Sequence, residues 1–492
     1  MTKWQRTGCV FGILILASFL RFYHFTTTPP GLYPDEAADG NNAVEALETG
    51  HFQTFYVEDN GREGMYINLI AVVLKVFPVY EPWVIRLPAA IAGVLTVLGI
   101  YFLAAELFGY STGLFASFLL ATSFWHINFS RIGFRAIFAP LLLCWALYFL
   151  LKAFKSSRDG IAAWYAIAAG IIYALGFYTY IAYRITPLLC LIFIPFFWGK
   201  QGFWKRVAIF TAVTFIVAAP IGWHFVNHPA DFFGRTSQIA ITKSESPARD
   251  FVMNLWTTLL MLNVNGDSNF RHNISRAPEL SAFAGIFFLT GTVLTVRRLL
   301  VHRRDENNQK NTFGSLLILL WFLLAILPAA ASNDGVPHAL RAILMLPPTM
   351  IFAAIAGVWL YESAYRLCVP DLSVRPIQAT ALLIVLTIAF SGYHDYFVVW
   401  AENPNVPFAF NADYVAMARE INELPRTMPK YVVVVAKGTL DRGIPVPAHT
   451  VMFLTHSFTE ADRAAANIRY LVPSQVSRIP AGTPNNQIFS LR

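Results

Sequence analysis

Residues 31–68 read GLYPDEAADGNNAVEALETGHFQTFYVEDNGREGMYIN, an acidic stretch between the first two long apolar segments of the chain. Arg62 is the one basic residue among its eight carboxylates, and repulsion between so many like charges is costly unless a ligand or a cation engages them. Pro34 followed by Asp35 and Glu36 also predicts a helix start, because proline fits the first helical position and carboxylates there meet the positive end of the helix dipole. The two acids are therefore either helix-start residues without chemistry or parts of a site, and the rest of the chain favours a site.

The composition of the whole chain is that of a polytopic membrane protein. Of its 492 residues, 56% are hydrophobic and 13% are charged, and the mean hydropathy is +0.50, values outside the range of soluble globular domains. The formal net charge of +8 does not indicate nucleic acid, because most Lys and Arg lie in short loops between apolar runs, where they set topology. The four cysteines lie in or beside apolar segments and indicate neither a disulfide framework nor a thiolate metal site.

About eleven segments are apolar over the roughly 20 residues that a helix needs to cross a bilayer. The first has the basic start and apolar core of a signal peptide but lacks a small-residue cleavage site, so we expect it to remain as a membrane helix. The predicted fold class is an all-α polytopic membrane protein. The segments are 8–25, 83–108, 112–129, 133–154, 161–183, 185–198, 207–226, 280–296, 313–331, 339–361 and 377–393.

The charges of the loops predict how the chain crosses the membrane. Short cytoplasmic loops carry an excess of Lys and Arg, and basic residues gather in loops such as 152–158 and 297–310. The amino terminus is then cytoplasmic, whereas 26–82, 227–279 and the residues after 393 lie outside. We therefore predict a multi-pass protein of the cell (plasma) membrane.

Two parts of the outer region have a predicted structure of their own. In loop 26–82, segments 36–48 and 65–77 are expected to be short helices near the interface, because 65–77 is too short to cross the bilayer. Residues 394–492 are predicted to form a small extracytoplasmic α/β domain that serves as a lid, docking or stabilising module beside the membrane module 1–393. Its predicted helices are 411–424 and 459–466, and its predicted strands are 431–436, 450–454 and 468–472.

Five arginines lie on the outer side against the charge rule: Arg86, Arg131, Arg135, Arg184 and Arg341. A charged side chain costs about 2.5 to 3.5 kcal/mol at the bilayer centre and less toward the interface. Each arginine could extend its head group to the lipid surface. The alternative is an anionic ligand, since the planar guanidinium fork suits phosphate.

Acids and phosphate-binding arginines on one membrane face together predict transfer of a group from a lipid-linked phosphate. A carboxylate would act as general base on an acceptor hydroxyl, and arginines would stabilise the departing phosphate. Loop 227–279 adds Asp267 and His272, which either belong to a solvated turn or contact sugar or phosphate. A divalent metal would use Asp35, Glu36 and Glu63, but no His-rich or DxD-like spacing supports it, so no cofactor is predicted to be required.

The ordered motifs of the chain resemble a known family. LYPDEA is followed by GREGMYINLIAVVLKVF, RLPAAIAGVLTVLGIYFLAAELFG, INFSRIGFRAIFAPLL, YALGFYTYIAYRITPLL and PHALRAILMLPP. This series, which covers the first ten predicted spans, is similar to the GT-C glycosyltransferases of the protein O-mannosyltransferase and lipid A aminoarabinose transferase type (glycosyltransferase family 39 and its bacterial relatives). The resemblance implies a polyprenyl-phosphate sugar donor and Asp35 as the catalytic base, with Glu36 beside it. Glu63 departs from the family pattern because Gly64 follows it where many relatives have proline.

We therefore predict an integral-membrane glycosyltransferase that moves a sugar, hexosyl or pentosyl, from a polyprenyl-phosphate donor to a hydroxyl of a lipid, glycan or protein on the extracytoplasmic face. A lipid or glycan transporter or flippase is the alternative, but it would carry ionisable residues at helix centres, which are nearly free of charge here. The predicted catalytic residues are Asp35 and Glu36, and the predicted substrate-binding residues are Glu63, Arg86, Arg131, Arg135, Arg184, Asp267, His272 and Arg341.

Overall fold

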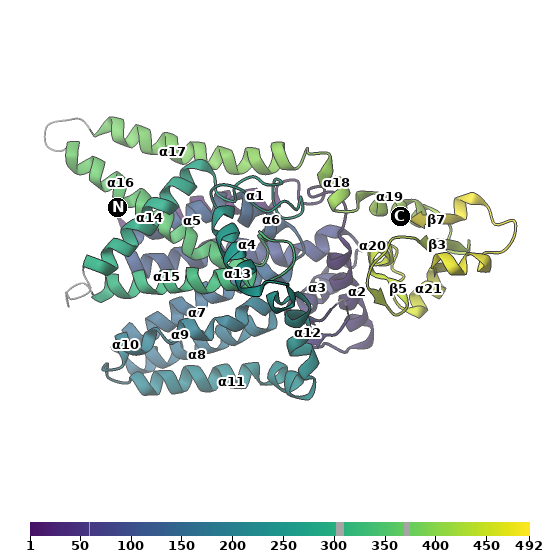
Figure 1. The fold of residues 1–492 in the computed structure, drawn as a ribbon, viewed down its shortest axis with the longest axis horizontal. Helices are drawn as coiled ribbons and strands as arrows, with labels where there is room; N and C mark the ends of the chain where they lie inside the picture. Colours follow the sequence, from purple (N-terminus) through teal and green to yellow (C-terminus); the bar gives the residue numbers. More distant parts are fainter. Residues whose placement is uncertain (59, 302–308, 369–373) are drawn as a thin grey trace.

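The long apolar helices of the protein lie side by side, and the carboxy-terminal segment extends from one end of this bundle (Figure 1). The computed structural model describes residues 1–58, 60–301, 309–368 and 374–492. Asp59 of the acidic stretch and Arg303 and Arg304 of the predicted basic loop lie outside the described residues.

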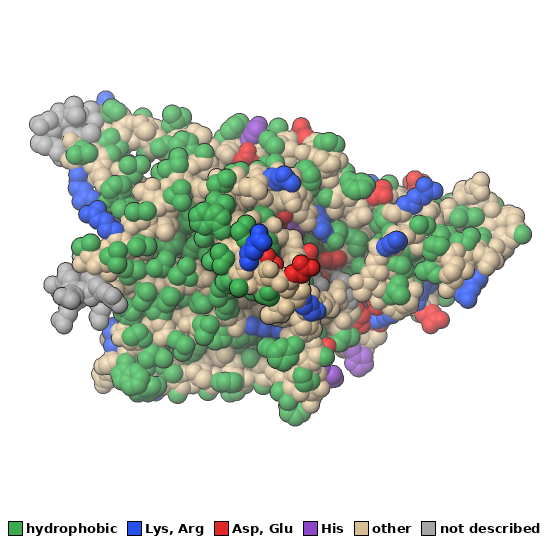
Figure 2. All heavy atoms as spheres, in the orientation of Figure 1, with side chains coloured by type: hydrophobic (Ala, Val, Ile, Leu, Met, Phe, Trp, Pro, Cys, Tyr) green, Lys and Arg blue, Asp and Glu red, His purple; other side chains and the backbone are tan. Residues whose placement is uncertain are grey.

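Nine helices in the described ranges are long and apolar enough to cross a membrane. Hydrophobic side chains are spread over the visible flank of the bundle, as expected for a surface that faces lipid (Figure 2). The spans are built on α1 (Lys3–Phe22), α4 (Pro82–Phe108), α7 (Phe138–Lys155), α8 (Asp159–Leu175), α11 (Phe203–Asn227), α14 (Ala282–Val301), α15 (Gln309–Ala330), α16 (Leu346–Cys368) and α17 (Arg375–Tyr393).

The predicted count of about eleven spans is not confirmed, because two of the predicted segments are interrupted. Segment 112–129 is divided at Ser123 into α5 (Tyr110–Thr122) and α6 (Phe124–Arg131). Segment 185–198 consists of α9 (Pro187–Cys190) and α10 (Phe193–Phe197), each containing a proline, which cannot donate a helical hydrogen bond. Hydropathy alone does not register either break.

The break between α5 and α6 leaves backbone carbonyls of α5 without helical partners, and a buried arginine satisfies them. Arg21, near the end of α1, donates to the carbonyl oxygens of Ala121 at 3.0 Å and Leu120 at 3.4 Å. Because no water is present in a bilayer core, such internal partners are required wherever a membrane helix is interrupted.

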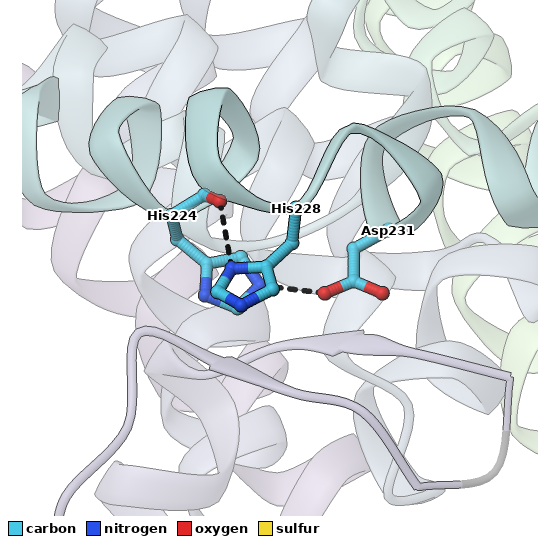
Figure 3. A group of neighbouring side chains, drawn as sticks. All are labelled: His224, His228 and Asp231. Atoms are coloured by element: carbon cyan, nitrogen blue, oxygen red, sulfur yellow. Dashed lines mark hydrogen bonds and ion pairs between the residues drawn. The ribbon is translucent and has the colours of Figure 1, made fainter.

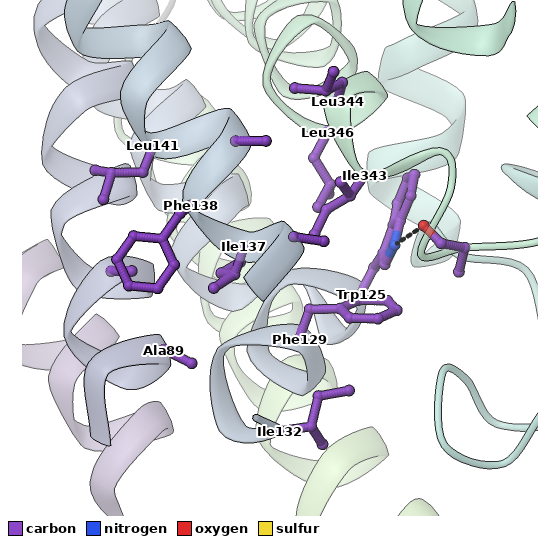
Figure 4. Close-up of a cluster of buried hydrophobic side chains, with 14 of the residues drawn as sticks. Ala89, Trp125, Phe129, Ile132, Ile137, Phe138, Leu141, Ile343, Leu344 and Leu346 are labelled. Carbon is purple, nitrogen blue, oxygen red and sulfur yellow. Dashed lines mark hydrogen bonds between the residues drawn. The ribbon is translucent and has the colours of Figure 1, made fainter. Parts of the chain in front are cut away.

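Helix α6 lies in the buried core and anchors a loop that reaches the candidate site. Trp125 and Phe129 are fully buried among residues of α7 and of the short helix η6 (Ile343–Met345) (Figure 4). The indole N–H of Trp125 donates to the carbonyl oxygen of Ala339 at 3.2 Å. Ala339, two residues before Arg341, is therefore fixed to the core.

The first loop forms the structure that the sequence predicts at the end of the bundle. The two expected short helices are confirmed as α2 (Pro34–Thr49) and α3 (Met65–Val76). A short antiparallel hairpin connects them; its strands, β1 (Phe55–Tyr56) and β2 (Arg62–Glu63), have two residues each, with Phe55 opposite Glu63. Helix α3 is fixed to α4 by the hydroxyl of Tyr66, which donates to the carbonyl oxygen of Ile85 at 2.6 Å.

The carboxy-terminal segment contains a three-stranded parallel sheet in the order β6–β3–β7. The predicted strands at 431–436 and 468–472 are confirmed as β3 (Lys430–Val434) and β6 (Ile468–Leu471), whereas β7 (Ile488–Leu491) was not predicted. The predicted helices are confirmed as α19 (Ala412–Glu423) and α21 (Glu460–Ala466).

Two details of this segment differ from the expectation. Residues 450–454 were predicted as a strand but form α20 (His449–Leu454), whose side chains are all buried; a short apolar run does not distinguish a strand from a buried helix. The last span, predicted to end at residue 393, continues through a π-helical turn to Trp400. Helix α20 packs on α2, and the hydroxyl of Thr450 donates to the carbonyl oxygen of Leu32 at 2.9 Å. The segment therefore holds the first loop in place.

Candidate active site

A polar cavity of about 360 Å³ opens where the first loop meets the end of the bundle. Its wall combines the start of α2, the hairpin, the segments around residues 135 and 180–184, both ends of α12 (Pro229–Ile239), and the loops around 270 and 334–341. Six of the predicted site residues line it: Asp35, Glu63, Arg135, Arg184, His272 and Arg341.

Two acids of α2 face the cavity. Asp35 is exposed in the first turn, after Pro34 at the helix start, and Asp39 lies one turn further on the same face. Asp39 is buried and bound by Arg62, whose guanidinium nitrogen is 2.6 Å from a carboxylate oxygen. Helical spacing of four residues could have identified Asp39 beside Asp35, but no local spacing pairs Asp39 with Arg62, which is 23 residues away in the chain.

The neighbouring acid, Glu36, is turned into the protein. It is fully buried, and its carboxylate lies 2.8 Å from Nε of Arg86 and accepts hydrogen bonds from the backbone N–H groups of Gly133 at 2.6 Å and Tyr33 at 3.1 Å. Arg86 also donates to the carbonyl oxygen of Gly31 at 2.8 Å. Among the described residues, neither Glu36 nor Arg86 lines the cavity. The geometry assigns the pair to fixing the start of α2 against α4.

Arg131 likewise lies away from the cavity. It is fully buried and donates to the hydroxyl of Tyr396 at 3.2 Å, and to the carbonyl oxygens of Leu20 at 3.2 Å and Thr28 at 2.9 Å. Its guanidinium carbon is 5.0 Å from the ring centre of Phe397. This arginine joins the ends of α1, α6 and α17, which explains its place against the charge rule without a ligand.

Glu63 holds two arginines at the cavity wall. Its carboxylate lies 3.1 Å from Nε of Arg135 and 3.2 Å from a terminal nitrogen of Arg184. Arg184 also donates to the carbonyl oxygen of Phe232 in α12 at 2.7 Å. One carboxylate between two guanidinium groups leaves a net positive charge, so this wall attracts an anion.

The loop after α13 (Pro247–Met261) carries Asp267 and His272, which meet His338 from the loop after α15. Asp267 is buried behind the cavity wall, with a carboxylate oxygen 2.8 Å from Nδ1 of His272 and 2.9 Å from the backbone nitrogen of Ala339. Burial lowers the pKa of both histidines, which are therefore neutral at pH 7, the form that binds metals. Burial raises the pKa of the Asp267 carboxyl, but hydrogen bonds from His272 and from the backbone N–H of Asn269 help to lower it, and the net shift is downward.

This cluster has the donor set of a divalent cation site. Its ligand atoms lie within 4.8 Å of one another, and Nδ1 of His338 is buried with no hydrogen-bond partner among the described residues. The metal-binding set considered from the sequence, Asp35, Glu36 and Glu63, is different, and Glu36 is engaged with Arg86.

Two arginines near this loop complete the cavity. Arg341 pairs with Asp334 at 3.1 Å and also donates to the hydroxyl of Ser332 and the carbonyl oxygen of Asp334. Arg271, which was not predicted to bind substrate, also lines the cavity, and its guanidinium carbon lies 3.7 Å from the ring centre of Tyr33. No spacing in the sequence could bring Arg271 to Tyr33, because they are far apart in the chain.

Glu279 provides a pH-dependent test of this loop's packing. It is buried, one carboxylate oxygen accepts a hydrogen bond from the backbone N–H of Asp267 at 3.2 Å, and the other has no hydrogen-bond partner in the described part of the chain. Burial, together with the charge of Asp267, raises the pKa of Glu279 well above the ordinary value of 4.5. The folded state then keeps a proton that the unfolded state releases. The contribution of Glu279 to the stability of the folded state is therefore full below pH 4.5 and is lost as the pH rises.

Glu279→Gln, which mimics the protonated acid, should therefore become more stable than the wild type as the pH rises above 4.5, by up to about 1.4 kcal/mol per pH unit. Thermal unfolding in detergent at a series of pH values measures this difference. Glu420→Gln, on the exposed face of α19, is the control and should show no such trend. A pH-independent difference for Glu279→Gln would contradict the raised pKa.

The chain is similar to known proteins in part of its sequence and in its fold. Residues 65–224 match the sequence model of the dolichyl-phosphate-mannose-protein mannosyltransferase family. The structure is similar to ArnT from Cupriavidus metallidurans bound to undecaprenyl phosphate, with a TM-score of 0.61 and 15% identity over 98% of this chain and 90% of that one. No individually curated protein matches the chain.

It is also similar to the oligosaccharyltransferase of Archaeoglobus fulgidus, with a TM-score of 0.59 and 15% identity over 96% of this chain. The chain spans 65% of that enzyme's length. A structure of the same archaeal enzyme, AglB, was solved with an inhibitory peptide and a dolichol-phosphate, and another with zinc and sulfate.

Proposed function

Because the chain has the fold of the GT-C glycosyltransferases, we propose that it transfers a sugar from a polyprenyl-phosphate donor to an acceptor hydroxyl in the cavity described above. The observation that carries this proposal is the exposed carboxylate of Asp35, at the start of α2, in a cavity that is also lined by arginines. The solved complexes of ArnT with undecaprenyl phosphate and of AglB with a dolichol-phosphate support a donor of this class.

Asp35 is the general base of the proposed reaction. Its carboxylate takes the proton of the acceptor hydroxyl as the acceptor oxygen bonds to the anomeric carbon of the sugar. The bond from that carbon to the phosphate oxygen breaks, and the lipid phosphate leaves with the electron pair. Glu36, one residue away, contributes by holding the start of α2 through Arg86, which orients Asp35.

Arg341 and Arg271 are the proposed phosphate ligands. The carboxylate that pairs with Arg341 belongs to Asp334, whose side chain is 71% exposed, so a phosphate can take its place. Arg271 lies over Tyr33, two residues before Asp35. Arg135 and Arg184 share Glu63 and contribute to the positive potential of the wall.

We further propose that the cavity faces the extracytoplasmic side of the cell membrane and that the amino terminus is cytoplasmic. Basic side chains such as Lys152, Lys155 and Arg206 lie at the opposite end of the helices, as the charge rule requires of a cytoplasmic face. The acceptor is a lipid, glycan or protein hydroxyl.

We propose that the reaction needs no resident metal, since arginines supply positive charge at the cavity. If a divalent cation binds beside the cavity, its ligands would be Asp267, His272 and His338. The cation would there add to the positive potential that attracts phosphate.

A direct assay tests the function. The purified full-length protein is incubated with polyprenyl-phosphate hexoses and pentoses and with candidate lipid, glycan and peptide acceptors, and mass spectrometry identifies the product. A product whose mass is the acceptor plus one sugar supports the proposal. Movement of an intact donor across a vesicle membrane without transfer would support the transporter alternative instead.

Arg341→Lys tests the assignment of the phosphate ligand. Lysine keeps the charge but loses the planar fork, and a hydrogen bond to a charged group is worth about 1.5 to 3 kcal/mol, or roughly a 10- to 100-fold rise in the KM for the donor. Arg366→Lys, an exposed arginine in α16, is the matched control and should leave KM unchanged. An unchanged donor KM in well-folded Arg341→Lys would limit this residue to its bonds with Ser332 and Asp334.

A further inference from the structure

A second group of metal-ligand side chains lies at the corner between α11 and α12, separate from the cluster around Asp267. It consists of His224, His228 and Asp231, whose side chains point toward one another (Figure 3). Nε2 of His224 is 2.8 Å from a carboxylate oxygen of Asp231, and the two imidazole rings stack with their centres 4.7 Å apart. The proposed glycosyltransferase reaction makes no use of this group.

The local sequence explains why the three side chains converge. His224 and His228 are four residues apart at the end of α11 and so lie on one face. Pro229 begins α12 and ends α11 before it, which turns the chain. Asp231 falls in the first turn of α12, where the helix dipole favours its carboxylate. As a result, one ligand atom from each residue lies within 4.8 Å of the others.

The hydrogen bonds of the histidines select their ligand atoms. Nδ1 of His228 lies 3.2 Å from the backbone carbonyl oxygen of His224, and since a carbonyl only accepts, this nitrogen carries the proton. The lone pair is then on Nε2 of His228. Histidines that bind metals commonly donate their other ring N–H to a carbonyl in this way. Nε2 of His224 already faces the carboxylate of Asp231, where a metal ion could replace the shared proton.

We propose that His224, His228 and Asp231 bind a divalent transition-metal ion of the zinc type. Two imidazole nitrogens and one carboxylate oxygen form a donor set that suits zinc and leaves a fourth position open. His228 is exposed, so an ion can enter from solvent. The bound ion clamps the start of α12 onto the end of α11.

The clamp lies at the wall of the candidate active site. Asp231 lines the cavity, and the ring of Phe55, another lining residue, is centred 5.1 Å from that of His224. The adjacent residue Phe232 accepts a hydrogen bond from Arg184. An ion at this corner therefore fixes the part of α12 against which Arg184 is positioned.

The metal alone is the probe, so the test does not depend on sugar transfer. Full-length protein is stripped with a chelator and titrated with Zn²⁺ by calorimetry, and the number of bound ions is compared between variants. His228→Gln is expected to bind one ion fewer than the wild type. His51→Gln, an exposed histidine outside the three clusters of the described chain, is the matched control and should bind as many as the wild type.

A replacement ligand separates metal binding from a structural role of His228. His228→Cys should retain the ion, and with Co²⁺ it should show the thiolate-to-cobalt charge-transfer absorption that the wild type lacks at this site. Monodispersity in detergent confirms that both variants are folded. The proposal is overturned if His228→Gln binds as many ions as the wild type, or if His228→Cys with Co²⁺ shows no additional charge-transfer absorption.

Discussion

Asp35→Asn is expected to lower the turnover of sugar transfer by about 10²- to 10⁴-fold, the usual contribution of a general base. Asparagine keeps the size of the side chain and can still accept a hydrogen bond at the start of α2, but it cannot take the acceptor proton. Donor binding should survive, because the phosphate is assigned to Arg271 and Arg341. The measurements are the single-turnover rate with saturating donor and, separately, the affinity for the lipid phosphate.

Asp413→Asn is the matched control for this substitution. Asp413 is also an exposed acid in the first turn of a helix, α19, and it does not line the cavity. If Asp35 served only the helix start, both variants would lose at most about 1 kcal/mol of stability and keep their turnover. A folded Asp35→Asn variant with wild-type turnover would therefore remove Asp35 as the base and leave Asp39 or Glu63 to be tested.

Arg86→Met is expected to produce the largest loss of stability, about 3 to 5 kcal/mol, because it leaves the buried carboxylate of Glu36 without its partner. The same substitution releases the hydrogen bonds from Arg86 to the backbone of the first loop at Pro29 and Gly31. The free energy of unfolding in mixed detergent and SDS micelles measures the loss.

Two further variants show that the effect comes from the buried charge. Glu362→Gln breaks the exposed pair between Glu362 and Arg366 in α16 and should change stability little, because solvent screens such pairs. Combining Arg86→Met with Glu36→Gln removes the unpaired charge and should recover part of the loss. If Arg86→Met unfolded like the wild type, the Glu36–Arg86 pair would not hold the first loop.

Local sequence patterns predicted most of the membrane fold. The apolar segments, the two short helices of the first loop and the helix start at Pro34 follow from length, hydropathy and capping, which are properties of neighbouring residues. The same patterns missed the break at Ser123, because the carbonyls that it exposes are satisfied by Arg21, about 100 residues away in the chain. They also assigned 450–454 to a strand. The run is instead a helix that is buried on all sides by contacts such as those with α2, and these contacts cannot be read from the local sequence.

The sequence by itself determined which residue types had to find partners: acids in a net-basic chain, and arginines on the face of the membrane where topology disfavours them. Only the tertiary structure decided which partner each one found. Asp35 and Glu36 are adjacent, yet one is exposed in the cavity and the other is bound to Arg86. Arg341 and Arg131 both lie on the side where the charge rule disfavours arginine, yet Arg341 lines the cavity and Arg131 joins three helix ends. The physical reason is that an ion in a low-dielectric region is held by whichever groups long-range packing brings within hydrogen-bond distance, and that distance is not encoded in any local spacing.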